Sequence, residues 1–326
     1  MRIVLFGCKD TTLLVAKFLF RNDISIDLVT VCRDIAEKND VAGYIDLTEY
    51  PDIFSTIFVA KSYNLSSPED KEFFETKGKC RLGFCVGWQR LIPSYVLDKF
   101  QNGVHGMHGS ARDLPYGKGR SPMNWALIED RKFFTTNLFR YVDGIDNGPV
   151  VAKSHFSINS SDTSETLHYK NALSMCKIIK DNLVALFEGS VCYTSQDTKE
   201  GESFYPKRVR QDGLIDWRDD IHNIERLVRA VAPPFYGAIA LLDGLELIFH
   251  RASIFYTDIE SHPFFSARLG QILEVFPNGK FLVRCSGGVL IVHEASGIQL
   301  SVGDCLDSVE SPFGRFQRNI YGFFDN

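Results

Sequence analysis

Hydrophobic and polar positions follow two alternating patterns along the first part of the chain. Short apolar, β-branched runs predict strands at 2–6, 24–31, 80–86 and 103–107, and apolar residues at helical spacing predict helices at 11–20, 68–76 and 93–100. Repeated alternation of strand and helix predicts a doubly wound (Rossmann-like) α/β domain with a mostly parallel sheet. Ligands of such sheets bind beyond the carboxyl ends of the strands, so the loops after Gly7, Val86 and Met107 are the first places to look for chemistry.

The same patterns predict how the first domain ends and the second begins. A helix containing 122–128, strands at 134–141 and 149–155, and a long helix over about 164–187 complete a first domain over 1–188. Residues 189–203 are polar and aperiodic, which predicts a linker. A helix at 221–231 and several short strands separated by glycines predict a smaller, mainly β domain over 204–326, either an OB-like barrel or an open sheet.

Composition narrows the class of protein. The 326 residues are 44% hydrophobic, which is enough to fill two cores, and their net charge of −5 gives no general attraction to nucleic acid or an anionic membrane. No stretch approaches the roughly 18 apolar residues of a membrane-spanning helix, and the first apolar run is too short for a secretory signal, so we expect a cytoplasmic protein. The eight cysteines form no CxxC pair and no zinc-type spacing, which predicts reduced thiols and no metal.

The segment richest in chemistry surrounds the end of the strand at 103–107. It holds His105, His108 and Ser110 among several glycines, and such glycine density predicts a close approach of the backbone to a ligand. About 38 positions after His108, Asp146 lies in a second loop that contains glycine. A histidine and a carboxylate brought together make a general base near neutral pH.

These residues resemble the ordered motif of the folate-dependent formyltransferase family, which reads Asn-x-His-x-Ser, Leu-Pro, Arg-Gly-x-x-Pro-x-x-Trp and Asp-x-Gly. The matching positions are His108 with Ser110, Leu114-Pro115, Lys118-Gly119 with Pro122 and Trp125, and Asp146 with Gly148. The segments 205–208, 212–217 and 228–230 resemble the start of the family's C-terminal domain. The resemblance therefore covers most of the chain.

The resemblance implies transfer of a formyl group from 10-formyltetrahydrofolate to an amine without a metal, with His108 as general base and Asp146 orienting it. One position departs from the family, because Gly106 stands where the family has an asparagine that helps to hold the formyl oxygen. Residues 106 and 108 of a strand share a face, so His105 points away unless a bulge turns it inward. Otherwise backbone N–H groups, Ser110 or Asn124 polarise the formyl group.

The resemblance also implies where the reduced folate binds. The family holds it with the loop after the strand at 80–86 and the loop before Asp146, so the expected contacts are Trp88, Arg90, Leu91, Ile92, Asp143, Gly144 and Ile145. For Leu91 and Ile92, packing in the core is an equal alternative.

The acceptor is the part of the function that the residues define least. Basic residues near the predicted ligand loops suit a phosphate-bearing acceptor, and the expected contacts are Lys118, Arg120, Tyr205, Lys207 and Arg208, with surface charge and aromatic packing as the alternative. The acidic balance favours a nucleotide-linked amino sugar, of the kind used in surface polysaccharide biosynthesis, over the tRNA of a methionyl-tRNA formyltransferase.

Three other functions are considered, of which two stay open. A formyltetrahydrofolate hydrolase would need similar catalytic residues, and Gly106 leaves room for a binding module without catalysis. A dinucleotide-binding domain is disfavoured because residues 6–12 lack the GxGxxG spacing. The residues define neither the sugar nor the nucleotide, and they do not decide whether the protein is a homodimer.

Overall fold

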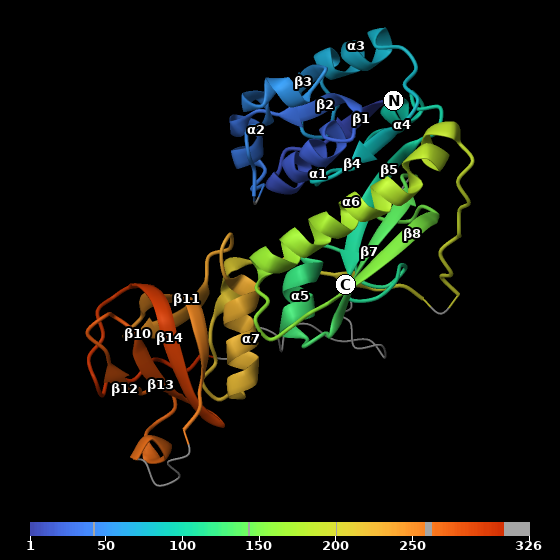
Figure 1. Cartoon of the computed structure of the whole chain (residues 1–326). Coiled ribbons are helices and arrows are strands. Elements are labelled where there is room, and N and C mark those ends of the chain that lie inside the picture. The colour runs from blue at the N-terminus through green and yellow to red at the C-terminus, as the bar shows by residue number, and fades with distance from the viewer. Residues whose placement is uncertain (42, 143, 200, 258–262, 310–326) are drawn as a thin grey trace. The chain divides into compact units, whose positions relative to one another are not determined.

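The computed structural model describes residues 1–41, 43–142, 144–199, 201–257 and 263–309 (Figure 1). The chain forms two compact units. The first comprises Met1–Gly119, Phe133–Ser157 and His168–Ser203, and the second comprises Arg120–Lys132, Ile158–Leu167 and the chain from Phe204 onward. Each unit is therefore built from three separate stretches of sequence.

The first unit is organised around a seven-stranded sheet. Its strands, in spatial order, are β3 (Thr56–Ala60), β2 (Ser25–Val31), β1 (Arg2–Phe6), β4 (Gly83–Cys85), β5 (Val104–Ser110), β7 (Phe133–Arg140) and β8 (Val150–Ser157). The first five run parallel, whereas β7 is antiparallel to β5 and β8 is antiparallel to β7. This confirms the predicted doubly wound, mostly parallel sheet.

Helices cover both faces of this sheet. On one face α1 (Asp10–Phe20) and the long α6 (Ser164–Glu188) bury Leu19 and Ile179 against Leu5 and Leu28, and Figure 1 shows α6 lying over β5, β7 and β8. On the other face lie α2 (Arg33–Lys38), α3 (Pro68–Thr76) and α4 (Ser94–Leu97). Each fully buried aliphatic side chain contributes about 1.5–3 kcal/mol, so both faces stabilise the sheet.

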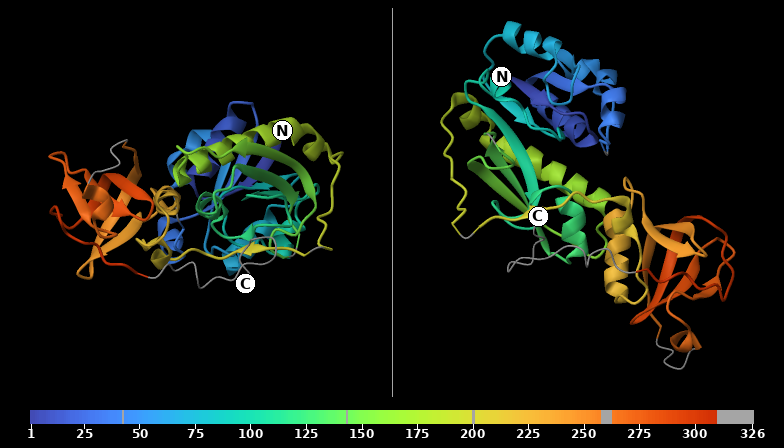
Figure 2. Two further views of the ribbon diagram at one scale, coloured as in Figure 1. Left: turned by 90° about the horizontal axis from the view of Figure 1, so that it is seen from below. Right: turned by 180° about the vertical axis from the view of Figure 1, so that it is seen from behind.

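The second unit contains a five-stranded antiparallel sheet with helices packed on it (Figure 2). Its strands, in spatial order, are β10 (Ala238–Leu242), β11 (Leu245–Phe255), β14 (Gly288–Gly297), β13 (Phe281–Cys285) and β12 (Ile272–Val275). The amphipathic α7 (Ile221–Val231) buries its apolar face against this sheet, and α5 (Pro122–Ile128) packs on α7. This confirms the predicted mainly β second domain.

Short elements complete the chain. These are the strands β6 (Lys118–Gly119) and β9 (Phe204–Tyr205) and the 3-10 turns Leu47–Glu49, Pro51–Ile53, Arg210–Gly213 and Pro263–Ser266. In the described part of the chain no helix is both long enough and apolar enough to cross a membrane.

Two segments differ from the sequence-based predictions in ways that affect the site. The strand expected at 103–107 continues to Ser110, because β7 pairs with it as far as Thr135, so His108 lies in a strand and not in a loop. The expected linker 189–203 belongs to the first unit. It pairs with β8 there, since Thr194 and Val150 exchange two backbone hydrogen bonds of 2.8 Å.

Candidate active site

A histidine and an aspartate meet at the carboxyl end of β5. Nδ1 of His108 lies 3.3 Å from Oδ2 of Asp146, and Nε2 lies 2.7 Å from the carbonyl oxygen of Gly117. The His108 side chain is 9% exposed and that of Asp146 is 19% exposed, so the pair is largely shielded from water. Both ring nitrogens therefore face hydrogen-bond acceptors, one on each side of the imidazole.

The loop that carries Asp146 is held by its backbone. Asp146 itself has a left-handed conformation, with φ of 51°. Gly148 leaves no room for a side chain, because a Cβ there would lie 1.5 Å from the carbonyl oxygen of Arg140. Nε2 of Gln196 donates hydrogen bonds to the carbonyls of Asp146 at 2.6 Å and of Gly148 at 2.8 Å. The segment predicted as a linker therefore helps to fix the aspartate.

Lys118 also binds the loop that carries Asp146, through Asn147. Its ammonium group donates to Oδ1 of Asn147 and to Oε2 of Glu202, each at 2.6 Å, and the residue is only 1% exposed. The buried ammonium group is paired with the Glu202 carboxylate, so its desolvated charge is compensated within the protein. Binding of acceptor phosphate by Lys118 stays a prediction.

His105 and Ser110 occupy different surroundings from the dyad. His105 points to the opposite face of β5, as the period of two predicts, and its Nε2 hydrogen-bonds the hydroxyl of Tyr193 at 3.0 Å. Burial, helped by the charge of Arg140, lowers the pKa of His105 to about 4. Ser110 donates to the carbonyl of Tyr116 at 3.0 Å. The structure thus brings neither side chain next to Asp146.

The residues expected to bind folate divide into core and surface. Trp88 and Ile92 are buried, and Trp88 packs edge-on against Tyr63. Arg90 lies over the ring of Tyr63 and donates to Oδ1 of Asn39. Leu91 is 62% exposed and Ile145 is 50% exposed, which leaves apolar surface on the loops after β4 and β7. Gly144 has a positive φ of 98°, and Asp143 lies outside the described residues.

The remaining residues expected to bind the acceptor belong to the second unit, where most of them have structural partners. Tyr205 is buried, stacks on Trp125 and donates to Glu129. Arg208 lies over the ring of Trp125 and donates to the carbonyl of Asp212. Arg120 is half-buried and Lys207 is exposed, so these two cations reach solvent.

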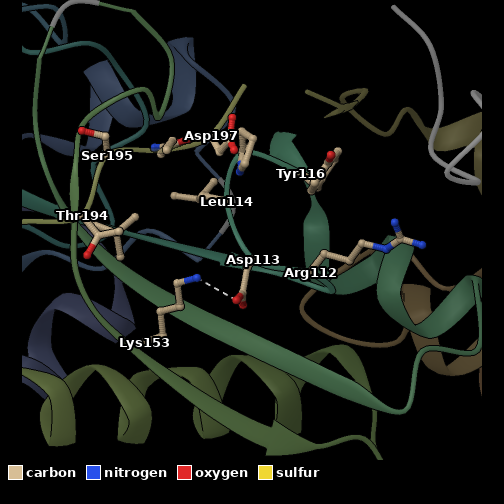
Figure 3. Close-up of a pocket in the computed structure, with 11 residues that line it drawn as sticks. Arg112, Asp113, Leu114, Tyr116, Lys153, Thr194, Ser195 and Asp197 are labelled. Atoms are coloured by element: carbon tan, nitrogen blue, oxygen red, sulfur yellow. Dashed lines mark hydrogen bonds and ion pairs between the residues drawn. The ribbon is translucent and has the colours of Figure 1, made fainter. Parts of the chain in front are cut away.

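A cavity of about 620 Å³ borders the elements that hold the dyad (Figure 3). It lies between the segment 112–116, which leads to Gly117, and the segment 194–197, which contains Gln196. Figure 3 shows Lys153 of β8 reaching Asp113, and their ion pair measures 2.7 Å. The cavity therefore combines apolar surface with charged groups, as a site for a polar organic molecule requires.

Two contacts in this region had no signal in the sequence. Gln196 lies 50 residues after Asp146, in a segment without periodicity. Asn137 is buried opposite His108 on β7 and donates to the His108 carbonyl at 3.3 Å, while its Oδ1 has no hydrogen-bond partner among the described residues. Within that same part of the chain, no group of three or more His, Cys, Asp or Glu side chains is placed to hold a metal ion.

Comparison with family models assigns both parts of the chain. The formyl transferase model matches residues 1–180, and the formyl transferase C-terminal domain model matches residues 208–304. The chain belongs to the formyl transferase family. It is accordingly an enzyme that transfers a formyl group, and the motif around His108 and Asp146 lies within the first match.

Solved structures show the same fold at low sequence identity. An N-formyltransferase from Helicobacter canadensis, in complex with folinic acid and dTDP-3-aminofucose, has a TM-score of 0.64 and 15% identity, covering 90% of this chain and 99% of that one. HypX from Aquifex aeolicus has a TM-score of 0.65 and 15% identity over 92% of this chain and 47% of its own. Methionyl-tRNA formyltransferase from Clostridium thermocellum has a TM-score of 0.57 and 15% identity, with coverage of 92% and 100%.

Proposed function

We propose that this formyltransferase moves the formyl group of 10-formyltetrahydrofolate onto the amine of a nucleotide-linked amino sugar. The observation that carries the proposal is the shielded pair of His108 and Asp146 at the carboxyl end of β5. A cavity lined by the segments 112–116 and 194–197, which lead to Gly117 and contain Gln196, gives further support. The Helicobacter canadensis structure, in complex with folinic acid and an amino sugar linked to dTDP, supports the choice of donor and acceptor.

The residues on the loops after β4 and β7 fit a reduced folate. Exposed Leu91 and Ile145 offer apolar contacts to a flat ring, and the described residues give the buried Nε1 of Trp88 no hydrogen-bond partner. We assign folate binding to Trp88, Arg90, Leu91, Ile92, Gly144 and Ile145. When bound, the folate supplies an activated formyl group.

The reaction requires one proton to move. A bond forms between the acceptor nitrogen and the formyl carbon, the bond from that carbon to the folate nitrogen breaks, and the proton lost by the amine reaches the folate nitrogen. His108 carries this proton. Because its Nε2 faces the Gly117 carbonyl, the amine reaches a free ring nitrogen only when that contact opens. Such proton transfer contributes about 10²–10⁴-fold.

Asp146 holds the imidazole by the side that faces the loop. Its carboxylate fixes the ring orientation and stabilises the charged ring formed when His108 takes the proton. We expect acceptor phosphate to meet cations, with the exposed Lys207 and the half-buried Arg120 as candidates. We also propose that the protein acts in the cytoplasm, in surface polysaccharide biosynthesis.

The test is release of tetrahydrofolate from 10-formyltetrahydrofolate with three kinds of acceptor. These are a panel of nucleotide-linked amino sugars, charged initiator tRNA, and buffer alone. Turnover with one sugar that is abolished in His108→Ala supports the proposal and names the acceptor. Turnover only with tRNA would instead identify a methionyl-tRNA formyltransferase, and turnover in buffer alone would identify a hydrolase.

A further inference from the structure

Residues 193–196 form a strap that ends on the loop that carries Asp146. Thr194 exchanges two backbone hydrogen bonds of 2.8 Å with Val150 at the start of β8, and Gln196 donates at 2.6 Å to the carbonyl of Asp146. Three of the four residues are exposed and Gln196 is half-buried, so burial in a core contributes little to holding the strap. Its position therefore depends on a few point contacts.

Tyr193 fixes the first residue of the strap to the fully buried His105. Its hydroxyl lies 3.0 Å from Nε2 of His105, and the two rings lie 13° from parallel with their centroids 6.1 Å apart. His105 belongs to β5, which is hydrogen-bonded to β4 on one side and to β7 on the other, so it is a rigid partner. The strap is thus tied to the interior of the sheet, on the face opposite to the dyad.

The same tyrosine lies beside the residue from which the Asp146 loop starts. The guanidinium carbon of Arg140 lies 5.9 Å from the centre of the Tyr193 ring. The backbone N–H of Arg140 donates to the carbonyl of Pro149 at 3.0 Å, and this hydrogen bond closes the loop at its base. Tyr193 therefore reaches the loop by two routes, along the strap and at the base of the loop.

The loop needs these restraints to keep the dyad together. Asp146 has a left-handed backbone, with φ of 51°, which a residue other than glycine adopts only when its surroundings hold it there. Its contact with His108, at 3.3 Å, is longer than the about 2.7–2.9 Å of a short charge-assisted hydrogen bond. A small outward movement of the loop is enough to end that contact, and a shift of about 1 Å in a catalytic group can lower a rate about 10²-fold.

We propose that Tyr193 is a positioning residue for formyl transfer, which keeps Asp146 against His108 by fixing the strap to His105 and by packing on Arg140. This inference rests on the proposed role of the dyad. Tyr193 acts through the strap and the loop and takes no part in the proton transfer. His105, the motif histidine that faces away from the dyad, thereby serves as the buried anchor of the strap.

The test is a double-mutant cycle between Tyr193→Phe and Gln196→Ala in the tetrahydrofolate-release assay. Phenylalanine keeps the ring beside Arg140 and removes only the hydroxyl, so the protein should fold with an unchanged Tm. One hydrogen bond shifts a population by about 2–10-fold, and kcat should fall by that factor while KM for folate and acceptor is kept. In the Gln196→Ala background the same change should alter kcat less than about twofold, because the route along the strap is already cut.

Two further measurements separate positioning from a general loss of structure. Tyr95→Phe removes a half-buried hydroxyl on α4, so it is the matched control and should keep its kcat. Tyr193→Ala removes both routes to the loop, and its kcat should fall further than that of Tyr193→Phe. Hydrogen–deuterium exchange should become faster in the strap and in the peptide that contains Asp146 in both Tyr193 variants, and should stay unchanged in β1 and β2.

The outcomes distinguish the inference from the proposed function. If Tyr193→Phe turns over like wild type while His108→Ala is inactive, formyl transfer stands and the role of Tyr193 is overturned. Equal losses of kcat in the wild-type and Gln196→Ala backgrounds would also overturn it, because the effect would not pass along the strap. If wild type releases no tetrahydrofolate with any acceptor, the proposed function fails, whereas faster exchange of the Asp146 loop in Tyr193→Phe would still support the positioning of that loop by Tyr193.

Discussion

Replacing Gln196 by alanine removes two hydrogen bonds that hold the Asp146 loop. Each bond to a backbone carbonyl, at 2.6 and 2.8 Å, contributes about 0.5–1.5 kcal/mol, so the loop loses about 1–3 kcal/mol of restraint. The left-handed backbone of Asp146 itself costs about 1–2 kcal/mol. Without the Gln196 hydrogen bonds, this cost favours other backbone conformations in which Asp146 no longer contacts His108. The population with Asp146 beside His108 should fall, and kcat with it, by roughly 5–150-fold.

The assay is steady-state release of tetrahydrofolate together with a thermal melt. We expect kcat to fall while KM for the acceptor and Tm change little, because the loop adds little to the buried core. Ser195→Ala is the matched control, since this neighbour lines the same cavity and holds no loop carbonyl. A kcat within twofold of wild type in a folded Gln196→Ala would refute the reasoning. An increase in KM alone would mean that Gln196 contacts the acceptor directly.

Three further predictions concern stability and the loop. The pKa of His105 is about 4 in the folded protein against about 6.5 in the unfolded chain, so the folded state favours the neutral ring. The contribution of His105 to the free energy of unfolding is therefore complete above pH 6.5, and roughly 3 kcal/mol of it is lost as pH falls to 4. In urea unfolding, His105→Leu should lack this part of the acid destabilisation, and an unchanged loss between pH 7 and 4.5 would contradict it. For Asp27, burial raises the pKa, but hydrogen bonds from Arg2, Thr56 and Lys77 outweigh burial and leave it lowered. The contribution of Asp27 to the free energy of unfolding is complete above the unfolded pKa of about 3.9 and disappears as pH falls through the lower folded pKa. Asp27→Asn should therefore be less stable than wild type at neutral pH and equally stable in acid, as urea unfolding at the two pH values would show. Gly148→Ala should abolish most activity in the formyl-transfer assay, because its Cβ cannot coexist with the Arg140 carbonyl, and an active, folded variant would show that this loop tolerates a shift.

Local periodicity was sufficient for most elements of the fold. The helices at 68–76, 122–128 and 221–231 have the predicted bounds, since their apolar spacing and N-terminal signals are local. Strand β3 was missed although residues 57–60 are a continuous apolar run; it lies at the edge of the sheet, where only its last residue is buried. The extension of β5 through His108 was missed because glycines resemble a loop in sequence, whereas pairing with β7 makes them a strand.

Only those site residues that belong to a sequence motif were predictable. His108 and Asp146 were named from their motif, and the structure places them 3.3 Å apart. The contacts of Gln196 with the Asp146 loop and of Tyr141 with Gly106 were not predictable, because each joins residues 35 or more positions apart with no pattern between them. The burial of Lys118 was missed for the same reason, since its partner Glu202 lies 84 positions away.

The way the chain shares its residues between the two units affects how the protein can be divided. The sequence leaves the first unit at Gly119, Ser157 and Ser203 and returns at Phe133 and His168. A truncation at residue 188 would therefore remove the Gln196 anchor and also separate α5 from its packing partner α7. No single cut yields either unit intact, so a fragment with the whole family motif would still lack part of its catalytic apparatus. Limited proteolysis after residue 188 should accordingly abolish activity without breaking the motif.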